Sequence, residues 1–176
     1  MRLAALLVAV TLSACGTTTP EPSASASIQW DSTAASEARA VVERGVRAFE
    51  SMDVEGVKSV IADRWATPSF ETDMENKPVR MATYADGIKY AEDIFAAVKK
   101  MGASLKVDVK DMTCRGTSTL QYCVMDHDVI ATMSDGKPAV QPQRATIVLG
   151  KGQAGWKWLH WHSSAGPAAS APAAVK

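Results

Sequence analysis

The chain has 176 residues, which is enough for one compact domain with extensions but not for two hydrophobic cores. It carries 19 basic and 19 acidic residues, and 47% of it is hydrophobic and 22% is charged, as in ordinary globular proteins. This balance excludes an intrinsically disordered chain. It also excludes a protein that binds nucleic acid through bulk positive charge, so no nucleic-acid partner is expected.

The first 15 residues have the pattern of an export signal. Arg2 precedes an apolar run, Leu3–Leu12, that is far shorter than the roughly 20 residues of a membrane-spanning helix. The run leads into Leu12-Ser13-Ala14-Cys15, which resembles a bacterial lipobox, so residues 1–15 are interpreted as a lipoprotein signal peptide that ends at a lipidated Cys15. Gly16 after the cysteine, in place of Asp, implies an outer-membrane anchor facing the periplasm of the bacterial envelope. The alternative is an ordinary cleaved secretory signal with a coincidental cysteine.

Two low-complexity segments flank the central part of the chain. Residues 16–30 are rich in Ser, Thr, Pro and Ala, which is typical of a flexible tether. Residues 165–176 have the same composition and are expected to form a disordered tail. Residues 31–164 remain for the folded domain, a comfortable size for one core.

Three helices are predicted in the first two thirds of the domain. Asp31 or Ser32 is placed to cap the first helix, and Asp53 to cap a short second helix. Thr83 and Asp86 have the spacing of a capping box at the start of a long helix that Gly102 terminates. Each helix has apolar residues three and four apart, which indicates one buried face.

Strands are predicted in two places. Residues 65–80 lose the helical period and contain turn residues, which favours two short strands. After Gly102 the period becomes two, and turn residues separate four longer strands, the last three of which are Leu120 to Met133, Ala139 to Leu149 and Trp156 to Ser163. Four strands joined by short turns form an antiparallel meander, and the helices must cover one of its faces. The predicted architecture is α+β.

Cys114 and Cys123 form an even pair once Cys15 is set aside, in a compartment that favours oxidation. They flank the turn of a predicted hairpin, where a disulfide between paired strands is expected. The alternative is two separate buried thiols. Eight residues lie between them, which is not the short spacing of a redox-active pair.

The last strand carries the strongest family signal. Trp156, His160, His162 and Ser164 follow a pattern that resembles the closing strand of the NTF2-like superfamily, most closely its SnoaL-like branch. The stretch Phe49–Val57 is also similar, and the resemblance covers about 32–164. It implies an NTF2-like cone in which three helices cover the concave face of a strongly curved antiparallel sheet, and it implies a homodimer formed through the sheet.

The resemblance also implies a pocket inside the cone, because members of this fold include binding modules, assembly domains and enzymes. Aromatic and imidazole side chains are expected to line it, and the candidates are Trp65, Tyr84, Trp158 and His160. The expected occupant is a small apolar ligand. The sequence therefore predicts a ligand-binding or self-assembly module carried on an envelope lipoprotein.

An enzyme is the alternative hypothesis. Asp126 or His127 would act as the base in proton transfer on a carbonyl compound, with Arg144 holding an anionic group, in an isomerase, cyclase or dehydratase type of reaction. These residues do not align with the Asp-His or Tyr-Asp patterns of the enzyme branches, which favours a non-catalytic role. The alternative for Arg144 is a structural role, in an ion pair with Asp126 or Asp128 across neighbouring strands.

Neither a metal nor another cofactor is expected. His160 and His162 lie two apart on one strand, so regular alternation places them on one face together with Trp156 and Trp158. Two imidazoles are only half of a zinc site, and the third candidate ligand lies two strands earlier in the sequence. A structural histidine pair is the favoured interpretation.

Overall fold

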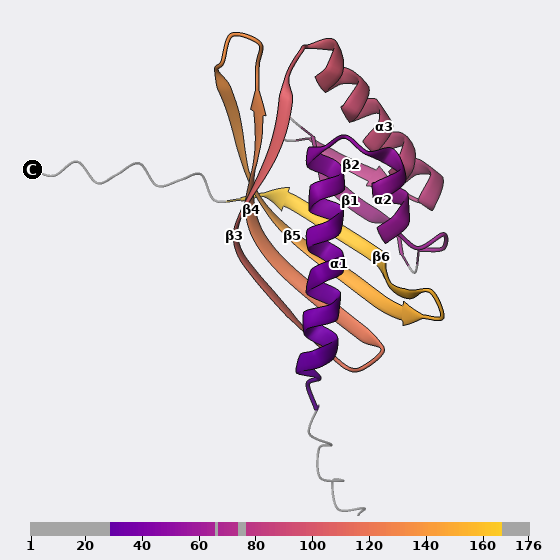
Figure 1. Ribbon diagram of the computed structural model, residues 1–176. Coiled ribbons are helices and arrows are strands. Elements are labelled where there is room, and N and C mark those ends of the chain that lie inside the picture. Colours follow the sequence, from indigo (N-terminus) through magenta and orange to yellow (C-terminus); the bar gives the residue numbers. More distant parts are fainter. Residues whose placement is uncertain (1–28, 66, 74–76, 167–176) are drawn as a thin grey trace, which may run out of the picture.

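The computed structural model describes residues 29–65, 67–73 and 77–166, and the predicted signal peptide, Cys15, most of the tether and most of the tail lie outside these residues. Six strands form one sheet in the order β2-β1-β6-β5-β4-β3. Three helices lie on the same side of the curved sheet, with α1 crossing it (Figure 1). The predicted α+β cone is confirmed. Among the described residues, no helix is long and apolar enough to cross a membrane.

The helices begin where the capping residues predict. Helix α1 spans Ser32–Glu50, and the Asp31 carboxylate accepts a hydrogen bond of 2.9 Å from the Ala34 N–H. Helix α2 spans Val54–Val60 with Asp53 at its N-cap position, although the Asp53 side chain makes no capping hydrogen bond. Helix α3 spans Tyr84–Lys100 and starts at the predicted capping box, in which the Thr83 and Asp86 side chains each accept from the other residue's backbone.

The strands follow the predicted order. The two short strands are β1 (Ser69–Thr72) and β2 (Pro78–Met81), and the long ones are β3 (Ser104–Gly116), β4 (Leu120–Thr132), β5 (Pro138–Gly152) and β6 (Gly155–Ala165). Strands β3 to β6 pair antiparallel in sequence order, which confirms the meander. Strand β1 pairs in parallel with β6, at the open edge of the meander, and Phe70 lies beside His162.

The core lies between the helices and the concave face of the sheet. Val42 of α1, Val60 of α2 and Leu149 of β5 are at most 1% exposed. Phe95 of α3 meets Phe49 of α1 edge-on, with ring centroids 5.2 Å apart. Apolar side chains from all three helices therefore share one core with the sheet.

A β-bulge in β6 changes which residues of the last strand face the core. Leu149 pairs with Trp158, but the next residue of β5 in the register, Val148, pairs with His160, so Leu159 has no partner. One extra residue reverses the alternation beyond it. The prediction that Trp158 and His160 share a face is therefore wrong, because beyond the bulge it is Trp161 that lies on the side of Trp158.

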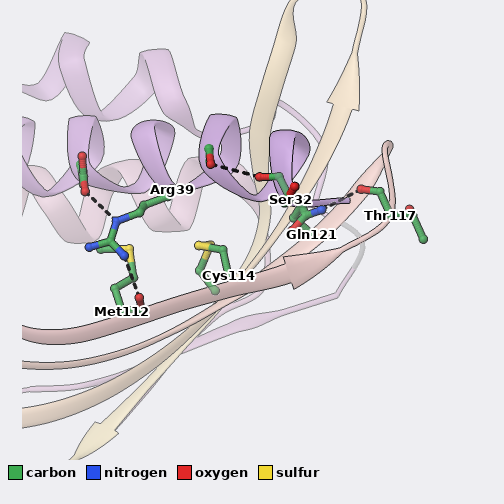
Figure 2. The surroundings of a disulfide bond; sticks show 9 residues. Ser32, Arg39, Met112, Cys114, Thr117 and Gln121 are labelled. Atoms are coloured by element: carbon green, nitrogen blue, oxygen red, sulfur yellow. Dashed lines mark hydrogen bonds and ion pairs between the residues drawn. A yellow bond between two sulfur atoms is a disulfide. The ribbon is translucent and has the colours of Figure 1, made fainter. Parts of the chain in front are cut away.

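The predicted disulfide is present in the structure. Cys114 of β3 and Cys123 of β4 lie directly opposite each other in the register, with Cα atoms 4.0 Å apart. The bond lies beneath α1, where the Arg39 guanidinium donates to the Met112 carbonyl oxygen at 2.8 Å (Figure 2). The crosslink therefore joins two strands at the place where the first helix packs on the sheet.

Reduction of this disulfide is expected to lower the free energy of unfolding by about 2 to 3 kcal/mol, because it releases a loop of ten residues in the unfolded chain. Urea unfolding with and without a reductant measures the effect. The Cys114→Ala/Cys123→Ala double variant is the control, and its stability should not respond to reductant. Equal stability of the oxidised and reduced wild type would contradict the prediction.

Candidate functional site

A cavity of about 390 Å³ lies between the three helices and the concave face of the sheet. Small residues make the room: Gly45 and Ala91 on the helices, and Ala131 and Ala145 on the strands, all belong to its wall. Most of the remaining wall is apolar. Met101, which is 48% exposed, also lines the cavity, so the cavity reaches the surface beside the end of α3.

Polar side chains line one part of this cavity. Four of them, one from each of four adjacent strands, form a strip across the sheet that we call the polar strip: Glu71 (β1), Ser163 (β6), Gln143 (β5) and His127 (β4). His127 and Gln143 are directly opposite in the register, and the Ser163 hydroxyl donates to Gln143 Oε1 at 3.0 Å. Tyr90 of α3 lines the same cavity.

Glu71 has only neutral hydrogen-bond partners. Its Oε1 accepts from the Thr72 N–H and its Oε2 from Trp161 Nε1, each at 3.0 Å. In the described part of the chain, no lysine or arginine forms an ion pair with it. Burial raises the pKa of Glu71, and donors on Thr72, Ser163 and Trp161 oppose that shift. The Glu71 carboxylate is therefore costly to ionise.

The phenol of Tyr90 interacts electrostatically with Glu71. Burial raises the pKa of Tyr90 above its ordinary value, and the nearby negative charges of Glu71 and Asp73 raise it further. Burial and the two acidic groups therefore both favour the protonated form of Tyr90. The phenol stays protonated and is a hydrogen-bond donor there.

His127 is the most enclosed titratable group of the polar strip. It is 7% exposed, and its Nδ1 has no hydrogen-bond partner among the described residues. Burial lowers the pKa of His127, and contact with Gln143 only partly offsets this, so the imidazole is neutral at pH 7. The indole Nε1 of Trp158, on the same cavity wall, is also unpartnered. Both nitrogens are fully buried, so each is an unsatisfied polar atom next to the cavity.

The candidate catalytic residues do not form one site. Only His127 faces the cavity, whereas Arg144 and Asp126 lie on the opposite face of the sheet and pair through two contacts of 2.7 and 3.1 Å. The Arg144 guanidinium lowers the pKa of Asp126. Arg144 therefore cannot hold an anion in the cavity, and the cross-strand pair that the sequence offered as the alternative is the one that forms.

The expected pocket residues are also divided. Trp158 lines the cavity, but Trp65, Tyr84 and His160 lie outside its lining. The ring of Trp65 packs against Trp161, with centroids 6.1 Å apart, and the bulge places His160 on the outer side, where its Nδ1 lies 2.9 Å from the Thr67 hydroxyl. Tyr84 packs against the core. Of the four expected residues, only Trp158 therefore lies on the cavity wall.

Within the described residues, no three His, Cys, Asp or Glu side chains come together as a group that could hold a metal ion. His127 is inside the cone, and the other two histidines lie on the far side of the sheet. Among the described residues of the cavity wall, the polar groups are therefore hydrogen-bonding side chains and one neutral imidazole.

The contribution of His127 to stability is expected to fall as the pH is lowered below the ordinary histidine pKa of 6.5, because His127 takes up a proton in the unfolded chain before it does so in the folded one. The fall is at most about 1.4 kcal/mol per pH unit, the limit for one proton. Urea unfolding at pH 7.5 and 5.5 measures it. The His127→Gln variant should lose this part of the pH dependence, whereas the exposed His162→Gln control should follow the wild type. Identical profiles for His127→Gln and wild type would contradict the assignment.

Comparison with known proteins identifies a family for the sequence and related folds among solved structures. The model of the SnoaL-like domain family matches residues 38–169. A search of curated proteins finds no match to the chain. The matched residues include the whole cavity wall, because its lining extends from Gly45 to Ser163.

Solved structures show the same fold at low sequence identity. An NTF2-like superfamily protein from Salmonella enterica is 16% identical, with a TM-score of 0.61 over 82% of this chain and 99% of that one. An NTF2-like protein of unknown function from Pseudomonas putida is 17% identical, with a TM-score of 0.63 over 77% and 89%. The CaMKII hub of S. rosetta is 17% identical, with a TM-score of 0.57 over 75% and 96%. With the family model matching three quarters of its length, the chain belongs to the SnoaL-like domain family, and its fold is NTF2-like.

Proposed function

We propose that the domain binds a small, mainly apolar molecule inside the cone. The observation that carries this proposal is the cavity of about 390 Å³, which lies within the size range of small-molecule sites. Its wall combines an apolar majority with the polar strip, and such a mixture fixes the orientation of a ligand.

The enzyme hypothesis is weaker than binding on this geometry. His127 faces the cavity, as a general base would, and its neutral state allows it to accept a proton. However, the proposed anion holder, Arg144, is on the other face of the sheet and is engaged by Asp126. The cavity contains the groups that ligand binding needs. The proton-transfer mechanism, in contrast, has no anion-holding residue once Arg144 is excluded.

Self-assembly is a second candidate function. The face of the sheet away from the helices carries exposed apolar side chains, among them Tyr122 at 38% and Val140 at 52%. The CaMKII hub is a structural neighbour, which gives the same fold a precedent as an association module. A homodimer through this face would leave the cavity accessible, because the cavity lies on the helix side. Binding and self-assembly are therefore compatible.

We also propose that the domain is held at the membrane by a lipid on Cys15. The support is the lipobox-like sequence and the polar, Pro-containing segment that follows it. Helix α1 begins at Ser32, so 16 residues separate the proposed lipidated cysteine from the folded domain. Such a segment would give the domain freedom to reach ligands or partners near the membrane.

Lipid attachment is tested by expressing the full chain in a Gram-negative bacterium and partitioning its membranes with a detergent. The wild type is expected in the detergent phase, and the Cys15→Ala variant is expected in the aqueous phase because it has no acyl chain. The Cys123→Ala variant is the matched control and should partition as the wild type. Equal partitioning of wild type and Cys15→Ala would contradict the proposal.

Ligand binding is tested with the neutral fluorescent probe N-phenyl-1-naphthylamine. The wild type should give a saturable rise in fluorescence. The Ala91→Leu/Ala145→Leu variant, which fills the cavity from opposite walls, should bind about tenfold more weakly without losing stability. Ala38→Leu is the control. It enlarges a fully buried side chain outside the cavity, so it should cost about 1 to 3 kcal/mol of stability and leave probe affinity unchanged.

Two results would contradict the binding proposal. The first is the absence of saturable probe binding to the folded wild type, and the second is equal affinity of the wild type and the filled variant. If the probe does not bind and sedimentation shows a dimer, self-assembly becomes the favoured function.

A further inference from the structure

The charges on the cavity wall are all of one sign. Among the described residues that line the cavity, Glu71 and Asp73 are the only ones with a charged side chain, and there is no lysine or arginine. A ligand with a carboxylate or phosphate would therefore find acidic groups and no lysine or arginine among the described residues of this wall. The wall thus disfavours anionic ligands.

Among the described residues, Glu71 has no positively charged partner. Both of its oxygens accept hydrogen bonds, but the donors are a backbone N–H and the indole of Trp161, which are neutral. Taking a carboxylate out of water costs free energy that neutral donors recover only in part, and burial accordingly raises the pKa of Glu71. A cation delivered by the ligand would supply the missing attraction.

Neutral groups around Glu71 suit such a cation. The rings of Tyr90 and Trp161 belong to the same wall, and aromatic faces attract ammonium groups. The imidazole of His127 is neutral at pH 7, so it does not repel a positive charge. His127 is 7% exposed and lines the cavity, so this imidazole lies inside the cone rather than on the outer surface.

We propose that the ligand of this cavity carries a basic nitrogen on an apolar body, with the protonated nitrogen paired to Glu71 and the body against the apolar wall. This inference rests on the proposed ligand-binding function and adds the chemical class of the ligand. The apolar body occupies the region of Met125, Ile147 and Trp158, and the nitrogen lies at the polar strip.

Three probes with one common body test the charge preference by isothermal titration calorimetry at pH 7.4: 2-(1-naphthyl)ethylamine, 2-(1-naphthyl)ethanol and 1-naphthylacetate. We expect the amine to bind about tenfold more tightly than the alcohol, because its hydrogen bond to Glu71 is charge-assisted. The carboxylate should bind most weakly. This comparison uses the wild-type protein, so it does not depend on the folding of any variant.

Glu71→Gln identifies the group responsible. This variant should bind the amine no more tightly than the alcohol and should bind the alcohol as the wild type does. Glu37→Gln is the matched control, because Glu37 pairs with Lys151 and Trp156 outside the cavity, and it should preserve the preference for the amine.

The outcomes separate this inference from the proposed function. If amine and alcohol bind equally, if the carboxylate binds best, or if Glu71→Gln keeps the preference, the ligand class is wrong and the binding function stands. If none of the three probes binds the folded wild type, the ligand class and the binding function both fail.

Discussion

The approach of α1 to β6 sets the geometry on which the rest of the cone depends. Gly45 faces the ring of Trp158 so closely that a Cβ atom at this position would lie 2.4 Å from a ring carbon. A glycine is therefore required for α1 to approach the sheet at this distance. Gly87 of α3 repeats the arrangement with Trp65, where a Cβ would also lie 2.4 Å from the ring. Two indole rings thus fix the positions of two helices over the sheet.

These contacts connect the helices to the cavity. Trp65 packs on Trp161, and Trp161 packs on Trp158, with centroids 6.1 and 5.9 Å apart. The three rings form a continuous aromatic wall from α3 to α1, and two of them line the cavity. The rings against which the two helices pack therefore also bound the cavity. The cavity thus depends on the small residues of its wall for its volume and on the rings of Trp158 and Trp161 for one of its sides.

Local signals in the sequence were sufficient to predict the helices and strands but insufficient to predict the residues of the cavity. Capping at Asp31 and at Thr83, the turns between strands and the pairing of Cys114 with Cys123 depend on residues close in sequence, and all were predicted correctly. Glu71 was missed because the alternation in β1 is inverted: Phe70 is 37% exposed, whereas the acidic residue after it lines the cavity. Hydrophobic patterning would place Phe70 inside and Glu71 outside.

The same kind of inversion occurs in β5, where Gln143 is 7% exposed and Val140 is 52% exposed. A sequence optimised for folding alone would bury the apolar residue. Polar residues on the core side cost stability unless a partner compensates them, and Nδ1 of His127 has no partner among the described residues. Positions that break the local pattern in this way are expected at functional sites. The inversions in β1 and β5 lie on the same cavity as His127, which is why they argue for a binding site rather than for three unrelated irregularities.

Strand β4 shows how one short segment serves both faces of the sheet. Asp126 and Asp128 face outward, where Arg144 and Lys110 pair with them at 2.7 and 3.3 Å. His127 between them faces inward because side chains alternate along a strand. A shift of one residue in the register would place both carboxylates in the cavity and the imidazole in solvent. Exposed ion pairs add little stability. However, Asp126 can pair with Arg144 only in the strand register that also buries His127. Their contribution is therefore to the specificity of the register, and through it to the composition of the cavity wall.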